Sequence, residues 1–108
     1  AAINPGLVVS SKSADYTGVL GDANTVLLQT GATKVFTIPA NASVAYAVGT
    51  ALTFIVTNAT GCTIAITTDT MTLANSATTG TRTLALNGIA TAIKMTSTTW
   101  LISGSGIS

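Results

Sequence analysis

Aliphatic residues alternate with threonine and other small residues along most of the chain. Leu52, Phe54 and Val56 occupy every second position, and Thr53 and Thr57 have the opposite parity. A period of two places the two sets of side chains on opposite faces of a β-strand, with the aliphatic set toward a core. The same alternation predicts strands in segments 62–66, 70–73, 83–86 and 89–96.

The inward face of segment 89–96 follows from the same rule. Its large aliphatic residues are expected to face the core, and its small or polar residues are expected to face outward. One apolar face and one small or polar face per strand is typical of half-buried antiparallel sheets. The expected inner set is Ile89, Ile93 and Met95, and the expected outer set is Ala90, Ala92, Lys94 and Thr96.

Turn-forming residues separate the alternating runs. Asn87-Gly88 is the strongest hairpin signal in the chain, because both residues tolerate positive φ. Segment 39–49 is the longest connection without clear alternation, and its Pro39 lacks the amide that a central strand needs. Further turns are predicted at 21–24, 30–33, 58–61 and 97–99, next to strands at 25–29, 34–38 and around Trp100 and Ile102.

Short strands that alternate with turns at this spacing predict an all-β fold. About seven or eight such strands are expected, which is the pattern of a sandwich, a jelly roll or a small barrel. We predict an antiparallel β-sandwich, jelly-roll-like, formed by residues 14–104. Residues 1–13 are predicted to form an N-terminal arm or an edge strand, and residues 105–108 a flexible C-terminal tail.

Charged residues are scarce in this chain of 108 residues. They make up 6% of the sequence, against about 25% in an ordinary globular domain, and histidine is absent. Catalysis and metal binding need several ionisable or ligating groups at one point, whereas here they are scattered singly. We therefore expect no enzymatic activity, no catalytic residue, no bound metal and no cofactor. The ionisable residues are Lys12, Asp15, Asp22, Lys34, Asp69, Arg82 and Lys94.

The weak charge also limits the classes of partner. A net charge of +1 gives no electrostatic reason to expect nucleic acid or an anionic membrane as a partner. The longest apolar stretch, 44–56, is shorter than the ~20 residues of a membrane-spanning helix. A surface this poor in charge is poorly protected against self-association. We expect other copies of the chain, or another protein, to cover much of the exterior.

Several single residues allow both a functional and a structural interpretation. Cys62 is the only cysteine, so it forms no internal disulfide, and a buried small side chain is expected. Trp100 could stack on a sugar, but its alternating run with Ile102 favours a core or interface anchor. Asp22 and Asp69 lie in turns, where we expect them to accept hydrogen bonds from local backbone amides.

Three short motifs have a functional form without the context that would support it. Asn41-Ala42-Ser43 and Asn58-Ala59-Thr60 match the glycosylation sequon, and chance in a chain rich in Asn and Thr is the preferred interpretation. Gly104-Ser105-Gly106 is followed by neither a Lys-Ser/Thr pair nor a helix, so it is not a phosphate loop.

Threonine pairs suggest one sharper hypothesis. Thr70 and Thr72, and likewise Thr81 and Thr83, form Thr-x-Thr pairs of the kind that some ice-binding proteins display on a flat sheet. These pairs do not recur at a fixed repeat length. A cross-strand threonine surface with good β propensity is therefore preferred.

From residue 15 to 104 the segments follow a recognisable order. A threonine-containing strand ends in Pro39, a Val-Gly-Thr entry at 48–50 leads into an apolar strand, and Lys94, Trp100 and Gly104 follow near the end. This order resembles a β-structured module of tailed-bacteriophage virion proteins. The module occurs in capsid decoration (cement) proteins and in tail-fibre or tail-spike proteins. The other segments that carry the resemblance are 21–28, 35–38, 51–58, 62–66 and 90–95.

The resemblance implies a non-enzymatic, usually trimeric protein that attaches to the virion, and it carries over no single binding residue. The chain has no coiled-coil or collagen-like stalk, which favours a decoration protein over a fibre. We expect it to bind the major capsid protein on the outer surface of the phage head and to stabilise contacts between capsid subunits. As a hypothesis, the arm 1–13 or the connection 39–49 makes the capsid contact.

Other functional classes stay open from the sequence. The first alternative is a tail-fibre or tail-spike module, or a receptor-binding tip, which would bind host cells or glycans. A remote alternative is a threonine-rich ice-binding protein. A bacterial surface or pilus subunit is a further possibility. As a virion protein, the chain would be made in the bacterial cytoplasm and would end on the surface of the phage particle.

Overall fold

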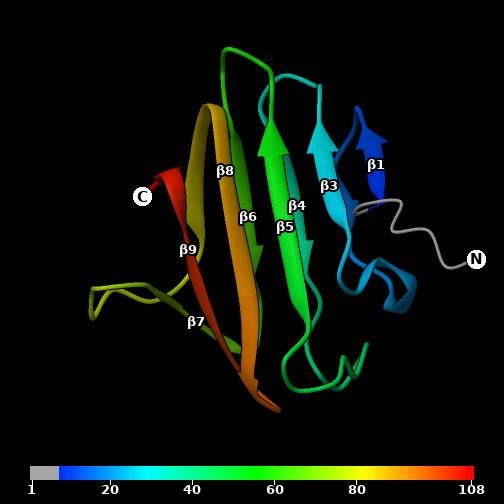
Figure 1. Cartoon of the computed structure of the whole chain (residues 1–108), viewed down its shortest axis with the longest axis vertical. Helices are drawn as coiled ribbons and strands as arrows, with labels where there is room; N and C mark the ends of the chain where they lie inside the picture. Colours follow the sequence, from blue (N-terminus) through cyan, green and yellow to red (C-terminus); the bar gives the residue numbers. More distant parts are fainter. Residues whose placement is uncertain (1–7) are drawn as a thin grey trace, which may run out of the picture.

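The structure, a computed structural model, describes residues 8–108, in which the regular elements are nine β-strands and one short 3-10 helix. Nine strands form one mixed sheet that curls into a nearly closed, barrel-like shape (Figure 1). The predicted all-β class is therefore confirmed. The elements are β1 (Val9–Lys12), β2 (Tyr16–Thr17), the 3-10 helix η1 (Leu20–Asp22), β3 (Val26–Gln29), β4 (Lys34–Ile38), β5 (Ala51–Val56), β6 (Cys62–Ile66), β7 (Thr70–Leu73), β8 (Arg82–Thr96) and β9 (Thr99–Ile107).

The curled sheet has two layers, one containing β1, β3 and β5 and the other β2, β4 and β6 (Figure 1). Within each layer neighbouring strands run parallel, with Leu27 opposite Phe54 in one and Phe36 opposite Ile64 in the other. Consecutive strands from β1 to β6 lie in alternate layers. Each strand therefore runs in the same direction as its neighbour in the same layer. The pairing predicted to be antiparallel is therefore largely parallel. The sandwich or jelly-roll topology is not confirmed.

The long strand β8 connects the two layers. Near its start Leu84 lies opposite Cys62 of β6, and farther along Ala92 lies opposite Leu52 of β5, both in antiparallel pairs. β9 then pairs antiparallel with β8, and β7 pairs parallel with β9. One strand thus belongs to both layers and closes one side of the barrel-like sheet.

The bend that allows this lies at Asn87-Gly88. Asn87 has a left-handed φ of 56°, and the register between β8 and β9 shifts between Leu84 and Ile89. The hairpin predicted at Asn87-Gly88 is therefore wrong, because these residues bend one continuous strand. A type I′ hairpin requires positive φ at both central residues, and of these two only Asn87 has it.

The faces of the later part of β8 are the reverse of those predicted. Ala90, Ala92 and Lys94 are almost fully buried, whereas Ile93 is 46% exposed and Ile89 and Met95 are similarly exposed. The inner face of β8 lies against large neighbours. Its pairing partners on the same face include Phe54, Trp100 and Ile102. Small alanine side chains leave the space that these larger groups fill.

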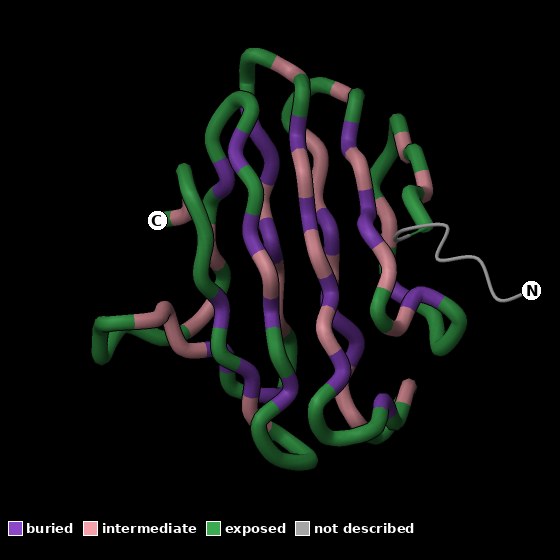
Figure 2. Tube along the Cα trace, in the orientation of Figure 1, coloured by how far each residue is buried: buried purple, intermediate pink, exposed green. Residues whose placement is uncertain are grey.

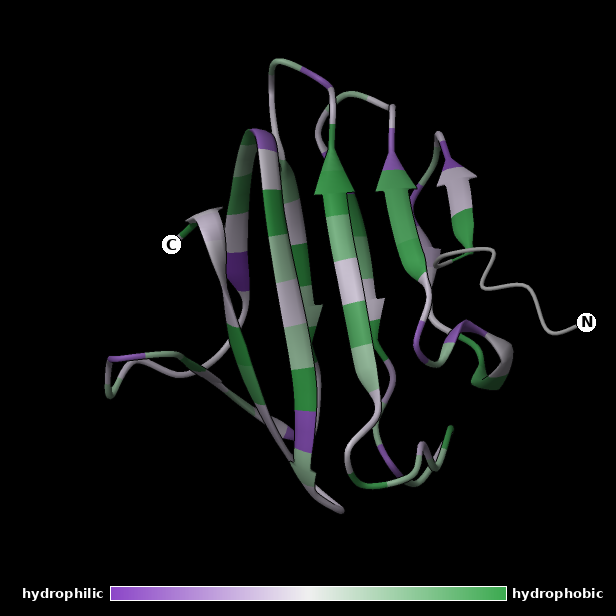
Figure 3. Ribbon diagram, viewed as in Figure 1, coloured by the Kyte–Doolittle hydropathy of each residue, from purple (hydrophilic) through white to green (hydrophobic). Residues whose placement is uncertain are grey.

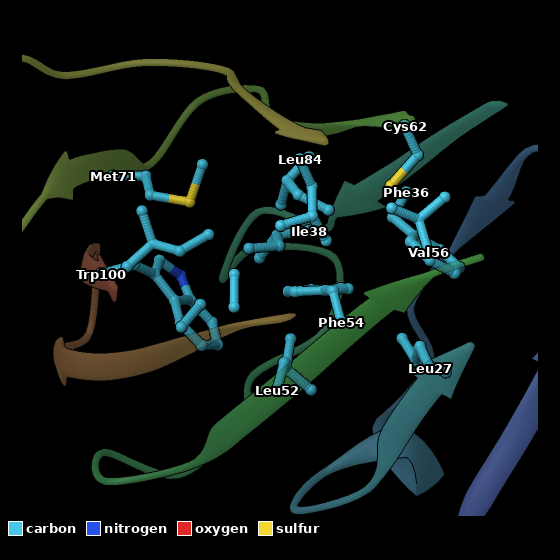
Figure 4. Close-up of a cluster of buried hydrophobic side chains, with 14 of the residues drawn as sticks. Leu27, Phe36, Ile38, Leu52, Phe54, Val56, Cys62, Met71, Leu84 and Trp100 are labelled. Atoms are coloured by element: carbon cyan, nitrogen blue, oxygen red, sulfur yellow. The ribbon is translucent and has the colours of Figure 1, made fainter. Parts of the chain in front are cut away.

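The core lies between the two layers, where side chains from both pack together (Figure 4). The rings of Phe36 in β4 and Phe54 in β5 have centroids 5.4 Å apart. Each large aliphatic or aromatic side chain that becomes fully buried stabilises the fold by about 1.5–3 kcal/mol. Several inward residues predicted from the alternation are confirmed as buried: Leu52, Phe54, Val56, Cys62, Ile64, Met71, Leu84, Trp100 and Ile102.

The two ends of the chain were only partly predicted. Within the predicted arm or edge strand, β1 is an edge strand that pairs with β3, and residues 1–7 lie outside the described residues. The tail predicted at 105–108 is not a free tail. β9 continues to Ile107, and the backbone N–H and C=O of Ser108 both hydrogen bond with Thr83, at 2.9 and 3.0 Å.

Gly104 allows β9 to lie close to the bend in β8, and this predicts a specific loss of stability. A Cβ at this position would clash with the backbone carbonyl oxygen of Ile89, so Gly104→Ala is expected to lower the unfolding free energy by about 2–3 kcal/mol. Urea denaturation measures this change. Gly21→Ala is the control, because no atom lies within 4 Å of its Cβ. A Gly104→Ala variant as stable as the control would contradict the prediction.

Candidate functional site

The side of the sheet that faces away from the core at β5, β8 and β9 is an uncharged surface, which we call the outer face. Its residues have the parity opposite to that of the buried residues, so the core does not cover them (Figure 2). Strongly hydrophobic and less hydrophobic residues alternate along β5 and β8 (Figure 3). None of its side chains is ionisable. The outer face consists of Ala51, Thr53, Ile55, Ile89, Thr91, Ile93, Met95, Leu101, Ser103 and Ser105.

Apolar and hydroxyl side chains alternate in rows across the outer face. Ile93 lies between Ala51 of β5 and Leu101 of β9. In the next row Thr91 lies opposite Thr53, and their hydroxyl oxygens are 3.1 Å apart in a cross-strand hydrogen bond. The threonine pair thus stabilises the sheet through a direct side-chain contact.

Four large apolar side chains of the outer face are exposed to solvent. Ile89, Ile93, Met95 and Leu101 are 45%, 46%, 44% and 37% exposed. Contiguous apolar patches on protein surfaces mark interaction sites more often than single exposed residues do. A neutral partner surface could cover this patch without removing a charge from water, which is the costly step in many interfaces. Sequence reasoning missed the surface because it assigned Ile89, Ile93 and Met95 to the core.

A second group of polar residues lies inside the fold, around Lys94. Only 1% of the Lys94 surface is exposed. Its Nζ donates hydrogen bonds to Oδ1 of Asn41 at 2.7 Å and to the backbone carbonyl of Tyr46 at 2.9 Å. The centroid of the Trp100 ring is 5.9 Å from Nζ, within the range of a cation–π contact. The connection between β4 and β5 supplies Asn41 and Tyr46, so Lys94 anchors this connection from within.

The two turn aspartates have different roles. Asp22 has the predicted local role, because its Oδ2 accepts the backbone N–H of Val19 at 2.9 Å and also the hydroxyl of Tyr16 at 2.7 Å. For Asp69 the predicted local role is wrong. Its buried carboxylate accepts the backbone N–H of Asn41 at 3.0 Å, 28 positions away. Asn41 therefore lies between Asp69 and Lys94, in a cluster that joins three distant parts of the chain.

Two further predictions about single residues are confirmed. Cys62 is buried, and burial raises the pKa of its thiol to about 11, which makes it a poor nucleophile at neutral pH. Trp100 is a core residue with 0% exposure. Among the described residues its indole Nε1 is the buried side-chain atom that lacks a hydrogen-bond partner.

The other ionisable residues lie apart from the Lys94 cluster. Asp15 accepts the backbone N–H of Val35 at 2.9 Å, and Nζ of Lys12 lies 4.2 Å from the centroid of the Tyr16 ring. Nε of Arg82 donates to carbonyl oxygens in its own turn. The structure thus brings Lys94 and Asp69 to the same residue, Asn41, and it brings Lys12 and Asp22 to another, Tyr16.

No pocket opens on the surface of residues 8–108, and within them no three His, Cys, Asp or Glu side chains gather at one point. In the same part of the chain, no helix has the length and apolar character needed to cross a membrane. Comparison of the chain with protein-family models, curated proteins and solved structures finds no match.

Two tyrosines make the stability of the fold depend on pH. The hydrogen bond that Tyr16 donates to Asp22 raises the pKa of its phenol to about 12, and burial raises the pKa of Tyr46 to about 12. In the unfolded chain both phenols ionise at about pH 10. A raised pKa in the folded state stabilises the fold fully below pH 10, and that contribution is lost as the pH rises toward 12.

We therefore predict that the unfolding free energy falls between about pH 10 and 12. Urea denaturation across this range measures the fall, in a Cys62→Ala background that removes the overlapping thiol titration. Tyr46→Phe keeps the ring but removes the phenol, so its curve should fall less steeply. Parallel curves for the two proteins would show that Tyr46 ionises in the folded state as it does in the unfolded chain.

Proposed function

We propose that this chain is a non-enzymatic structural protein of a tailed-bacteriophage virion, and specifically a capsid decoration protein. In this proposal it binds the major capsid protein on the outer surface of the head and stabilises the contacts between capsid subunits. The observation that supports the proposal best is the outer face, an uncharged sheet surface with four large aliphatic side chains exposed. Such a surface suits protein–protein contact rather than the binding of a charged ligand.

The size of the outer face favours a multivalent mechanism. A stable protein interface uses roughly 20–30 residues on each side, and the outer face alone has fewer. A single contact would therefore be weak. A homotrimer gains avidity because it engages several capsid subunits at once, and each additional contact becomes intramolecular. The trimer is part of the proposal, since the sequence resemblance implies it.

The hypothesis that the arm 1–13 or the connection 39–49 contacts the capsid takes second place to the outer face. The connection is held from within, because Tyr46 is 3% exposed and its carbonyl accepts a bond from Lys94. Within 1–13, only residues from Val8 onward belong to the described part of the chain. Deletion of residues 1–10 tests the arm, and unchanged particle binding would exclude it.

A tail-fibre or tail-spike module is the second candidate. The parallel stacking of β1, β3 and β5, and of β2, β4 and β6, favours it. Parallel strands stacked in this way are the unit from which elongated β-solenoids are built. Because β1 and β2 end their layers, such a module could continue from those edges.

Replacement of one outer-face residue tests the docking surface. Ile93→Lys places a charge at the centre of the apolar row, and we expect it to weaken particle binding by about tenfold or more. Cosedimentation of purified protein with phage heads stripped of decoration measures the binding. The variant should stay folded by circular dichroism, because Ile93 points away from the core.

Leu20→Lys is the matched control for this experiment. Leu20 is 62% exposed on η1 and is not part of the outer face, so this variant should bind as the wild type does. Equal binding by Ile93→Lys, Leu20→Lys and the wild type would show that the outer face is not the contact surface.

The copy number in purified virions separates the two candidate functions. A decoration protein should approach the number of capsomer junctions, and a tail module should be present in only a few copies. Quantitative gel analysis against the major capsid protein gives this ratio. A low ratio would reject the decoration role and favour the tail module.

A further inference from the structure

The buried amine of Lys94 has an unusual environment. Lys94 is 1% exposed, and the hydrogen bonds that its Nζ donates go to neutral oxygens, on Asn41 and Tyr46. Burying an ammonium group is costly unless an opposite charge or a full set of hydrogen bonds compensates for it. A hydrophobic side chain at this position would avoid that cost. The presence of a buried amine beside Trp100, Asn41 and Tyr46 therefore needs a chemical explanation.

The amine lies within reach of an electrophile. Nζ of Lys94 is 2.7 Å from Oδ1 of Asn41, and a C=O bond is about 1.23 Å long, so Nζ is no more than about 3.9 Å from the amide carbon Cγ. Reacting atoms in a near-attack arrangement are separated by roughly 3–3.5 Å. The fold thus holds a primary amine against the carbonyl group of a side-chain amide.

The fold fixes both partners in place. Lys94 lies on β8, paired with Trp100 of β9, so the sheet fixes its main chain. The main chain of Asn41 is held by the carboxylate of Asp69, which accepts its N–H at 3.0 Å. Both groups are therefore preorganised, and the entropy cost of bringing them together is met by folding.

We propose that Lys94 and Asn41 form an intramolecular isopeptide bond after the chain has folded. The neutral amine of Lys94 is the nucleophile, as lysine amines are in other covalent reactions of proteins. Nζ attacks Cγ of Asn41, the new C–N bond forms, and the bond from Cγ to Nδ2 breaks. The leaving nitrogen departs as ammonia with the proton that Nζ gives up.

The reaction balances without any other reactant. A lysine amine and an asparagine amide become a secondary amide and ammonia, so atoms and charge are conserved and no oxidant is needed. The new bond joins positions 53 residues apart. It would tie the connection between β4 and β5 covalently to β8. This inference does not depend on the proposed virion function.

The mass of the intact protein tests the bond directly. Loss of ammonia predicts that the folded wild-type protein is lighter than its sequence mass by about 17 Da, even when measured under denaturing conditions. Lys94→Met has no amine and should have its full sequence mass. A wild-type protein that is folded by circular dichroism and still has its full sequence mass after prolonged incubation would overturn the proposal.

Peptide mapping separates the cross-link from a cyclised asparagine, which also loses ammonia. Trypsin cuts after Lys12, Lys34, Arg82 and Lys94, but not after an acylated lysine. The cross-linked protein should therefore give peptide 35–82 joined to an uncut peptide 83–108. Free peptides 83–94 and 95–108 in the fraction that has lost ammonia would show cyclisation instead and would overturn the proposal.

Asp69 is a positioning residue in this reaction, and the cross-linked fraction tests that role. Asp69→Ala removes the acceptor for the Asn41 N–H and should lower the fraction that is cross-linked. Asp69→Asn keeps an acceptor oxygen and should restore it. Equal cross-linking in the alanine variant and the wild type would remove Asp69 from the proposal.

Discussion

The pairing of one strand with both layers is the constraint on which the rest of this structure depends. β8 pairs with β6 near its start and with β5 farther along, and β9 then follows it. Each layer otherwise consists of short parallel strands, whose edges would be exposed without this long antiparallel partner. The bend at Asn87-Gly88 lies between the residues of β8 that pair with β6 and those that pair with β5, and it turns the strand from one layer to the other without ending it.

The inner face of β8 follows from that position. At Ala90 and Ala92 this face lies next to the large side chains of Phe54 and Ile102, so small side chains fit best at these two positions. Ala90 and Ala92 meet this requirement. Lys94 follows them on the same face and extends to the connection between β4 and β5, where oxygen atoms of Asn41 and Tyr46 accept its hydrogen bonds. The buried polar cluster is thus a consequence of how β8 is placed.

The outer face is the other consequence. Because alanines occupy the inner positions of β8, its large aliphatic residues point to solvent and, with Leu101, form an uncharged apolar surface. Because only 6% of the residues are charged, charge repulsion does little to oppose the association of this surface with a neutral partner. The proposed attachment to a virion and the proposed cross-link therefore concern opposite faces of one strand. One face would join the chain to other proteins, and the other would join two parts of the chain.

The sequence by itself determined the all-β class, several strand positions and most of the core of β5, β6 and β9, because alternation and turn residues are local signals. Segments 34–38 and 62–66, for example, are strands as predicted. Only the tertiary structure decided the direction of pairing, the role of Asn87-Gly88 and the faces of β8. The reason is physical: alternation shows that a strand has two faces, but packing against distant residues decides which face is buried. Ile93 and Lys94 illustrate this: hydrophobicity alone predicts that Ile93 is buried and Lys94 exposed, and the structure shows the opposite. The cluster of Lys94, Asn41 and Asp69 gave no local signal either, because its members come from three separate segments that only the fold brings together.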